Sequence, residues 1–366
     1  MGRTMREFAT TWDGDKKIWF ERDEDELIGT QQAGGVPQPR IRICDLMSGP
    51  TNRDRYKPPV LWSGDDGIIE SHYVNGADAY FRRPSNYDVL ILQFAGEAAV
   101  ESEFGEFRLK PGHVMHVPAG SAYRVIGNSQ CHQLVAKIRE FFDVGVDPDK
   151  PMSETVFDVR RAGDNAESES VAFPERKGKI LEVTEFWKDE ADPIVMQRDH
   201  AKLVGCATGN SQRKVTVLRA FDYFTGTTGK GGVRAPELFR SKSFRCDVYN
   251  TEGEQFGFHR GCDSEEIWFQ FRGQAKNDTE WGVHHLSPGE IGYVPRGIAH
   301  RITGDKNFLR FNLYFQCQMR PKVDASNHHV ESTYEVETPS RKELPAFAEA
   351  KARIEDALAK NQQPRM

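Results

Sequence analysis

The chain has 366 residues and a formal net charge of −6, and 38% of its residues are hydrophobic. These values predict a soluble globular protein with room for two domains, and they exclude intrinsic disorder. They also argue against nucleic acid as a partner, because phosphate binding needs a clustered basic face.

The chain carries no sign of membrane insertion or export. No stretch reaches the roughly 18 consecutive apolar residues that span a bilayer, and the polar N-terminal segment does not resemble a signal peptide. The six cysteines lie far apart and form no CxxC pair. We therefore expect reduced thiols in a cytoplasmic protein without a membrane partner.

A repeated unit organises the chain. Residues from about 60 to 140 contain short alternating strands separated by Gly and Pro turns, and the same pattern returns from about 235 to 318. Three blocks recur at one constant offset, which we call the repeat offset (270 − 93 = 177). The pairs are Gln93–Gly96 with Gln270–Gly273, Pro111–Gly112 with Pro288–Gly289, and Pro118–Gly120 with Pro295–Gly297. Recurrence without a gap predicts the duplication of one structural unit.

The repeat divides the chain. We expect an all-β fold of two tandem β-barrels of the jelly-roll type, the first over 1–145 without metal and the second over 205–325 with metal. Residues 146–204 are rich in charge, Pro and Ser and predict a linker. In the tail, 326–366, apolar residues at helical spacing from about 341 to 360 predict a C-terminal helix packed on the surface.

Three candidate metal ligands occur together in the second repeat. They are His259 before its first motif strand, Glu266 in the strand that ends at Gly273, and His300 after the second turn. One repeat offset earlier, the equivalent positions hold Arg82, Val89 and Tyr123. Two imidazoles and one carboxylate suit a mononuclear non-haem Fe(II) with open positions, and Mn(II) is the less favoured alternative.

Two neighbouring residues are rivals for roles at this site. Glu265 competes with Glu266 for the carboxylate role, and since adjacent strand residues face opposite sides, only one of them can point into the barrel. The spacing to Gly273 favours Glu266. Cys262 lies inside the same segment, where a structural thiol is the favoured interpretation.

The spacing of these residues resembles the two signature motifs of the cupin superfamily, G(x)5HxH(x)3-4E(x)6G and G(x)5PxG(x)2H(x)3N. The first motif runs here from His259 to Gly273 and the second from Gly289 to His300. Gly261 replaces the second His of HxH, and a Gly replaces the final Asn. The resemblance implies two fused cupin barrels, a bicupin.

A narrower resemblance concerns the homogentisate 1,2-dioxygenases. FHRGCDSEE is similar to their HRNCMSE iron motif, and YDVLILQFAGEAAVESEFGEFRLKPG is similar to their N-terminal barrel, so the likeness covers about two-thirds of the chain. It implies iron held by His259, Glu266 and His300, with extradiol-type cleavage of a dihydroxylated aromatic ring. The family's upstream catalytic His has no counterpart in GGVRAPELF, and Phe258 replaces a Tyr. A related hydroquinone, catechol or hydroxybenzoate is therefore the expected substrate, rather than homogentisate.

Residues on the strand faces next to the ligands are candidates for substrate binding. Period-two alternation places two residues on the face of Glu266, and polar residues alternate on the strand after His300, where they could orient a phenolate or a carboxylate. The expected substrate-binding residues are Trp268, Gln270, Arg310 and Asn312. A structural ion pair is an equally good interpretation of Arg310.

These features predict a small aromatic substrate and O2 as partners of an Fe(II) enzyme. The competing hypothesis is a cupin that is not an oxygenase: a metal-dependent isomerase or decarboxylase, or a small-molecule-binding protein without catalysis. Because duplicated barrels commonly associate, we also expect a homo-oligomer.

Overall fold

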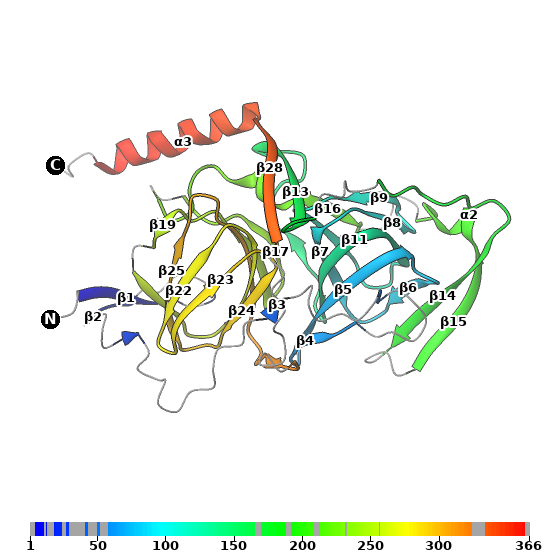
Figure 1. Ribbon diagram of the computed structural model, residues 1–366, viewed down its shortest axis with the longest axis horizontal. Coiled ribbons are helices and arrows are strands. Elements are labelled where there is room, and N and C mark those ends of the chain that lie inside the picture. The colour runs from blue at the N-terminus through cyan, green and yellow to red at the C-terminus, as the bar shows by residue number, and fades with distance from the viewer. Residues whose placement is uncertain are drawn as a thin grey trace.

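The computed structural model shows two β-barrels side by side (Figure 1). It describes residues 4–10, 12, 18–23, 27–28, 41–42, 50–51, 58–164, 170–187, 192–207, 213–230, 233–255, 257–323 and 334–362. The expected all-β fold of two tandem cupin-type barrels with a C-terminal helix is confirmed. Within the described residues, no helix is long and apolar enough to cross a membrane.

The strands of each barrel follow one another along the chain. Those of the first are β4 (Val60–Ser63), β5 (Gly67–Ala77), β6 (Phe81–Pro84), β7 (Asp88–Ala95), β8 (Ala98–Ser102), β9 (Gly105–Leu109), β10 (His113–Val117) and β11 (Tyr123–Ile138). Those of the second are β17 (Glu237–Arg240), β18 (Phe244–Tyr249), β19 (Gly253–Glu254), β20 (Phe258–Gly261), β21 (Glu265–Arg272), β22 (Ala275–Thr279), β23 (Gly282–Leu286), β24 (Glu290–Val294), β25 (Ala299–Gly304) and β26 (Leu309–Phe315).

Strand pairing confirms the duplication and its repeat offset. Strand β6 pairs with β11 through Arg82 and Tyr123, and β20 pairs with β25 through His259 and His300. Each member of the second pair follows its counterpart in the first by the repeat offset. The positions compared in the sequence are therefore structurally equivalent, so the first barrel is an internal control for the second.

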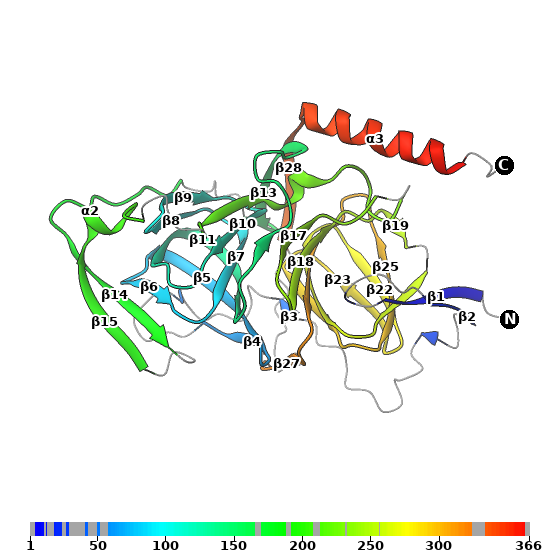
Figure 2. The same cartoon turned by 180° about the vertical axis from the view of Figure 1, so that it is seen from behind.

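The two repeats exchange their N-terminal strands. Strand β1 (Thr4–Thr10) pairs in parallel with β20 of the second barrel, and β14 (Ile180–Trp187) pairs in parallel with β6 of the first. Each begins an antiparallel hairpin, with β2 (Ile18–Asp23) and β15 (Asp192–Asp199) respectively. In Figures 1 and 2 the dark blue β1 lies beside the yellow strands of the second barrel, and the green β14–β15 hairpin borders the first.

Further short strands repeat this exchange. Strand β3 (Ile41–Arg42) pairs with β24 and β16 (Thr216–Arg219) with β10, while β12 (Asp143–Val144) pairs with β17 and β27 (Arg320–Pro321) with β4. Strands β13 (Ser153–Arg161) and β28 (Tyr334–Glu343) form a separate two-stranded sheet. Each exchanged strand pairs backbone groups that would otherwise form an open sheet edge.

This arrangement differs from the expected domain boundaries. Strands β1, β2 and β3 were assigned to the first domain, over 1–145, but they belong to the sheets of the second barrel. The segment expected as a linker, 146–204, contains β13, β14, β15 and the short helix α2 (His200–Leu203). Pairing partners far apart in the chain leave no mark in local composition, so the sequence pattern missed the exchange.

An aromatic core joins the two barrels. Strand β7 is buried on both faces, and β21 is buried along all but its last residue. One face of each points into its own barrel and the other packs on the opposite barrel, where the ring of Phe94 lies 5.4 Å from Phe269 and 6.0 Å from Phe271. Phe221, in the 3-10 helix η2 (Ala220–Tyr223), contacts Phe271 with centroids 4.7 Å apart. Burial of such large rings is a major stabilising term, so we infer that the barrels stabilise each other.

The predicted C-terminal helix is confirmed as α3 (Pro345–Gln362), which overlaps most of the predicted range from about 341 to 360. It begins just after β28 and runs alongside the second barrel in Figures 1 and 2. We expected it to pack on the surface, but its described side chains are exposed or half-buried. The cysteines that the structure describes are all free thiols.

Histidine burial in the first barrel gives a prediction about pH. His132 is 7% exposed and stacks on Tyr73 with ring centroids 4.7 Å apart. Burial, reinforced by the nearby charge of Arg161, lowers the pKa of His132 to about 3. The folded state therefore keeps this histidine neutral while the unfolded chain protonates it near pH 6.5, so stability is present above that pH and is lost as the pH falls. Between pH 7 and pH 5 the loss is about 2 kcal/mol.

The matched variant is His132→Leu, because Leu309 occupies the equivalent position of the second repeat. We expect its free energy of unfolding to fall by about 2 kcal/mol less than that of the wild type over the same pH range. Urea unfolding at both pH values measures this difference. Identical pH dependence in the two proteins would show that His132 is not neutral in the folded state.

Candidate metal centre

His259, Glu266 and His300 come together inside the second barrel. They lie on three strands, His259 on β20, Glu266 on β21 and His300 on β25. Each offers one donor atom, and the three donor atoms lie within 4.8 Å of one another. Since β20 and β25 pair directly, the two imidazole rings meet with centroids 3.9 Å apart at an interplanar angle of 62°. The geometry places three potential ligands around one point.

The hydrogen bonds of His300 leave one ring nitrogen free toward this point. Nδ1 of His300 lies 3.1 Å from the carbonyl oxygen of Ile298, which assigns the ring proton to Nδ1. Nε2 is buried without a hydrogen-bond partner, and it lies 3.5 Å from Oε2 of Glu266. A lone pair and a carboxylate facing each other in a buried site repel, and a cation between them would remove that repulsion.

The protonation states also suit a cation. Burial lowers the pKa of His259 to about 3, and the neighbouring His300 contributes in the same direction. Burial alone would raise the pKa of Glu266, but the two imidazoles beside it and the hydrogen bond from Trp268 bring it to about 2. At neutral pH the site therefore presents a neutral His259 and an ionised Glu266, which are the forms that bind metals.

Glu265 points away from this cluster. Its Oε2 accepts hydrogen bonds from the hydroxyl of Tyr293 at 2.7 Å and from the backbone N–H of Met319 at 2.6 Å. Adjacent residues of a strand face opposite sides, so Glu265 belongs to the outer face of β21 and Glu266 to the inner face. Glu266, the carboxylate that the motif spacing favours, is therefore the one that lies beside the two histidines.

Trp268 lies beside the cluster and orients Glu266. Its indole Nε1 donates a hydrogen bond of 3.0 Å to Oε2 of Glu266, and its ring meets that of His300 edge to face at 5.1 Å. These contacts make Trp268 a positioning residue for the carboxylate and one imidazole, and its role in substrate binding stays a prediction.

Arg310 is a fully buried cation in the same barrel. Its guanidinium lies over the ring of Trp268 at 4.4 Å, Nε donates to Oδ1 of Asn312 and Nη1 donates to Oδ1 of Asn277, both at 2.9 Å. Nη2 is buried without a partner. In the described part of the chain, no carboxylate lies within ion-pairing distance of Arg310, so the structural ion pair considered from the sequence is absent.

Asn312 holds the Arg310 side chain by a hydrogen bond. Its Oδ1 accepts from Arg310, and its Nδ2 donates to the hydroxyl of Tyr314 at 3.1 Å. The Tyr314 hydroxyl in turn lies 2.9 Å from that of Tyr249. The result is a polar chain on the inner faces of β18 and β26 that ends at the unpartnered Nη2 of Arg310.

The side chain of Gln270, expected to bind substrate, forms a hydrogen bond to the backbone. Its side-chain amide donates to the carbonyl oxygen of Arg272 at 2.8 Å, which holds the turn at the end of β21. In the first barrel the equivalent Gln93 donates to the carbonyl oxygen of Ala95, also at 2.8 Å. Because the barrel without the ligand cluster makes the same bond, Nε2 of Gln270 has a structural role in both repeats, while its Oε1 is buried without a partner among the described residues and its role in substrate binding stays a prediction.

Three further residues around the site carry no signal in the sequence. Phe8, on the exchanged strand β1, stacks on His259 with ring centroids 5.7 Å apart. Asn277 accepts a hydrogen bond from Arg310, as described above. Asp247 is buried on β18 opposite Asn312, and burial, partly offset by Arg245, raises its pKa to about 7. No motif marks these positions, although period-two alternation places Asp247 on the same face as Tyr249.

Two other residues of the motif segment, Gly261 and Cys262, lie near the ligands without being ligands themselves. A Cβ atom placed on Gly261 would lie 3.7 Å from Oε1 of Glu266, so the position that holds a second His in the motif faces the carboxylate and carries no side chain. Cys262 is exposed, and its sulfur lies 3.8 Å from the backbone carbonyl oxygen of Arg260. It is not part of the ligand cluster.

The equivalent positions of the first barrel hold no such cluster. Arg82 and Tyr123 pair across the strands where the two histidines pair in the second barrel, and Val89 replaces the carboxylate. The interior there combines buried apolar side chains, among them Val89, Ile91 and Met115, with the polar side chains of His72 and Asp78 beside Arg82. The ligand set is therefore a property of one barrel and not of the fold.

Comparison with known proteins supports no closer identification. No protein-family model matches the chain, and no curated protein is similar enough in sequence to count as a relative. Solved structures that resemble it include a cupin 2 conserved barrel domain protein of Leptotrichia buccalis, with 9% identity, 77% of this chain and 98% of that chain covered, and a TM-score of 0.40. The protein Ylba of E. coli has 8% identity, covers 78% and 89%, and has a TM-score of 0.39.

A third solved structure that resembles this chain is a mutant of Bacillus subtilis oxalate decarboxylase. It has 12% identity, with 84% of this chain and 88% of that chain covered, and a TM-score of 0.43. Likenesses this distant carry no argument about activity. The strand register and the ligand cluster described above define a protein of two cupin-type β-barrels with a potential His-Glu-His metal site in the second barrel.

The hydrogen bond from Trp268 to Glu266 gives a prediction about metal affinity. The variant Trp268→Phe keeps an aromatic ring but loses the donor, so the carboxylate is held less firmly. Loss of a bond that orients a ligand typically weakens metal binding by about 10–100-fold. Trp62→Phe is the control, since Trp62 is also buried but lies in the first barrel and its Nε1 has no partner. Equal Fe(II) affinities of the two variants in anaerobic titrations would contradict the assigned role.

Proposed function

We propose that His259, Glu266 and His300 hold a single Fe(II) ion in the second barrel, with Mn(II) as the less favoured metal. The observation that carries this proposal is the set of two imidazoles and one carboxylate around one point, with Glu266 and His300 buried, His259 half-buried, and Nε2 of His300 left without a hydrogen-bond partner among the described residues. This donor set suits non-haem Fe(II) with open positions.

We propose further that the protein is a ring-cleaving dioxygenase for a dihydroxylated aromatic compound of the hydroquinone, catechol or hydroxybenzoate type. When bound, Fe(II) would act as a Lewis acid for a phenolate oxygen and as the site where O2 is activated. The motif resemblance supports this reaction. The surroundings of the ligands support an anionic aromatic substrate, because they combine the rings of Phe8 and Trp268 with the buried cation of Arg310.

The chain's own residues then divide into clear roles. Trp268 orients Glu266, and Phe8 packs on His259, so two ligands are held by residues that do not themselves bind the metal. Arg310 offers the unpartnered Nη2 to a phenolate or a carboxylate, held in place by Asn277 and Asn312. Burial of these groups keeps water away, which strengthens the attraction between cation and anion.

A redox-neutral reaction at the same metal is the competing function. The ligand cluster fits a metal-dependent decarboxylase or isomerase about as well, since a buried arginine recognises any carboxylate substrate. The oxalate decarboxylase of Bacillus subtilis has Mn(II) centres, which is a property of that protein.

An oxygen-uptake experiment separates the two functions. The metal-free protein is loaded anaerobically with Fe(II), and O2 consumption is then followed with hydroquinones, catechols and hydroxybenzoates. The proposal expects uptake of one O2 for each ring opened, with an Fe(II) requirement that Mn(II) or Zn(II) does not meet. Turnover of a carboxylate substrate with Mn(II) and without O2 consumption would establish the redox-neutral alternative. A thermal shift with a phenol but no product would indicate a binding protein.

A further inference from the structure

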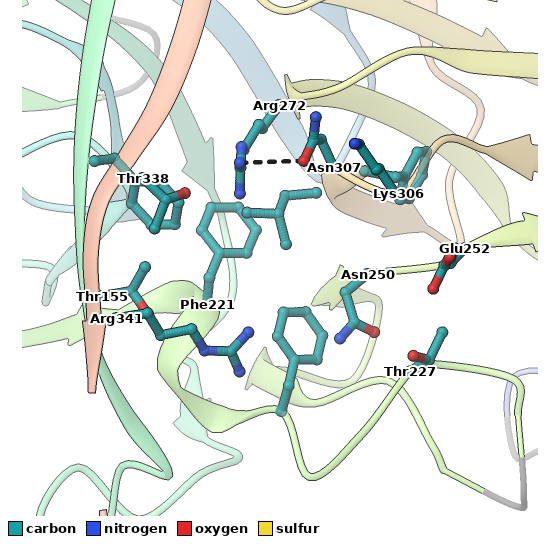
Figure 3. A pocket seen from close by; sticks show the side chains of 14 residues that line it. Thr155, Phe221, Thr227, Asn250, Glu252, Arg272, Lys306, Asn307, Thr338 and Arg341 are labelled. Atoms are coloured by element: carbon teal, nitrogen blue, oxygen red, sulfur yellow. Dashed lines mark hydrogen bonds between the residues drawn. The ribbon is translucent and has the colours of Figure 1, made fainter. Parts of the chain in front are cut away.

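A second cavity, of about 190 Å³, lies away from the ligand cluster. It is bordered by the β13–β28 sheet, the segment around η2 and the loop that precedes β26, and it is open to solvent on one side (Figure 3). We call it the second-repeat cavity. Its floor is aromatic, since Phe221, Phe224 and Phe308 line it and are at most 3% exposed. These rings form the apolar part of a cavity whose remaining lining is largely polar.

Three cations surround this floor. Arg272 follows from the end of β21, Lys306 from the loop before β26, and Arg341 from β28. Figure 3 shows Arg272 and Arg341 directed into the cavity on either side of the Phe221 ring. One carboxylate, Glu252, also lines the cavity. Among the described residues, no carboxylate lies within ion-pairing distance of any of the three cations, so their charge is not neutralised by direct contact.

The surroundings of Arg272 disfavour the charged form of its guanidinium. Burial lowers its pKa, Arg341 lowers it further by repulsion, and Asp305 acts in the opposite direction. The Asp305 carboxylate is occupied, because it accepts backbone hydrogen bonds from Gln274 and Asn307, both at 2.8 Å. Within the described residues, the guanidinium of Arg272 donates to neutral acceptors, the carbonyl oxygen of Val336 at 3.2 Å and Oδ1 of Asn307 at 3.3 Å. An anion in the cavity would relieve both the burial cost and the repulsion.

The first repeat has an equivalent cavity, and its lining lacks the three cations of the second-repeat cavity at the corresponding positions. That cavity measures about 240 Å³, and most of its lining residues precede those of the second-repeat cavity by the repeat offset. Where the second-repeat cavity has its three cations, the first-repeat cavity has Ala95, Ser129 and Asp164. The fold alone therefore requires no positive charge at any of these positions.

We propose that the second-repeat cavity is a binding site for a small aromatic carboxylate. A single ring fits, because an apolar cavity of about 150 Å³ is large enough to bind benzene. The ring would pack on Phe221 and Phe224, and the carboxylate would meet Arg272 and Arg341, with Lys306 at the rim. Charge-assisted hydrogen bonds from a guanidinium to a carboxylate are among the strongest in proteins. This site is separate from the metal centre, and the inference does not depend on the proposed dioxygenase activity.

The test uses benzoate as the probe and the whole protein. Isothermal titration calorimetry at pH 7 compares the wild type with the double variant Lys306→Ser, Arg341→Asp, which installs the residues of the first-repeat cavity at two exposed positions. We expect at least a tenfold loss of benzoate affinity. Lys351→Gln, an exposed cation on α3, is the control and keeps wild-type affinity. Benzyl alcohol, which has the ring without the charge, binds at least tenfold more weakly than benzoate.

The metal centre provides the remaining control. His300→Ala, which removes a ligand of that centre, retains benzoate binding if the carboxylate occupies the second-repeat cavity. The proposal is overturned if benzoate affinity is unchanged in the double variant, if benzyl alcohol binds as tightly as benzoate, or if His300→Ala abolishes binding. Failure to bind benzoate at all also overturns it. None of these outcomes bears on oxygen uptake, so the two proposals fail independently.

Discussion

The variant His300→Ala is expected to lose stoichiometric Fe(II) binding together with all metal-dependent turnover. The substitution removes the donor atom that faces Glu266 at 3.5 Å. A non-haem Fe(II) site of this kind has only three protein ligands, so loss of one leaves two donors and an unshielded carboxylate. Anaerobic Fe(II) titration followed by elemental analysis measures the effect, with the wild type expected to bind one iron per chain.

His285→Ala is the matched control. His285 is an exposed histidine on β23 of the same barrel and is not part of the ligand cluster. This variant is expected to keep one iron per chain. Circular dichroism and thermal unfolding establish that both variants are folded, so that metal loss cannot be a consequence of unfolding. One iron per chain in folded His300→Ala would refute the ligand assignment.

Arg310→Gln is expected to reduce turnover sharply while leaving the metal in place. Hydrogen bonds to a charged group contribute about 1.5–3 kcal/mol, so loss of the guanidinium corresponds to a decrease of about 10- to 150-fold in kcat/KM for an anionic substrate. The first barrel carries Gln133 at the equivalent position, which shows that a glutamine fits this place in the strand. Steady-state oxygen uptake at fixed Fe(II) content measures the change.

The stability of Arg310→Gln tests the same interpretation in a second way. Burial, partly offset by Glu266 and the two tyrosines, lowers the pKa of Arg310 to about 10, so the buried charge costs about 3 kcal/mol of folding free energy. Two hydrogen bonds from the charged group to Asn277 and Asn312 recover a similar amount. We therefore expect the free energy of unfolding to change by less than about 2 kcal/mol. A large loss of stability with unchanged kcat/KM would make Arg310 a structural residue.

Much of this architecture could be predicted from the sequence because it repeats. The blocks that recur at the repeat offset lie at turns, where Gly and Pro are required by backbone geometry, and strand pairing reproduces that offset. The same regularity selected Glu266 over Glu265, since period-two alternation is a property of every strand. Composition and spacing act locally, and they are informative wherever the fold is determined locally.

Contacts between distant parts of the chain were not predictable in this way. The exchange of β1 and β14 between the barrels brings Phe8 onto His259, and no local pattern marks either partner. Gln270 was placed on the correct strand face, but its hydrogen bond to the following turn could be seen only with backbone geometry. Arg310 was correctly placed in the barrel. Its neighbours come from β21, β22 and β26, and local sequence patterns could not show that no carboxylate among the described residues pairs with it.

Anomalous diffraction at the iron absorption edge, from crystals of the Fe(II)-loaded protein grown without O2, tests the metal centre most directly. We expect one anomalous peak per chain, bounded by Nε2 of His300, the imidazole of His259 and the carboxylate of Glu266. A peak between Arg82 and Tyr123 in the first barrel, or at the exposed His285 instead of the ligand cluster, would contradict the proposed centre. So would the absence of any peak from protein that had been shown to contain iron.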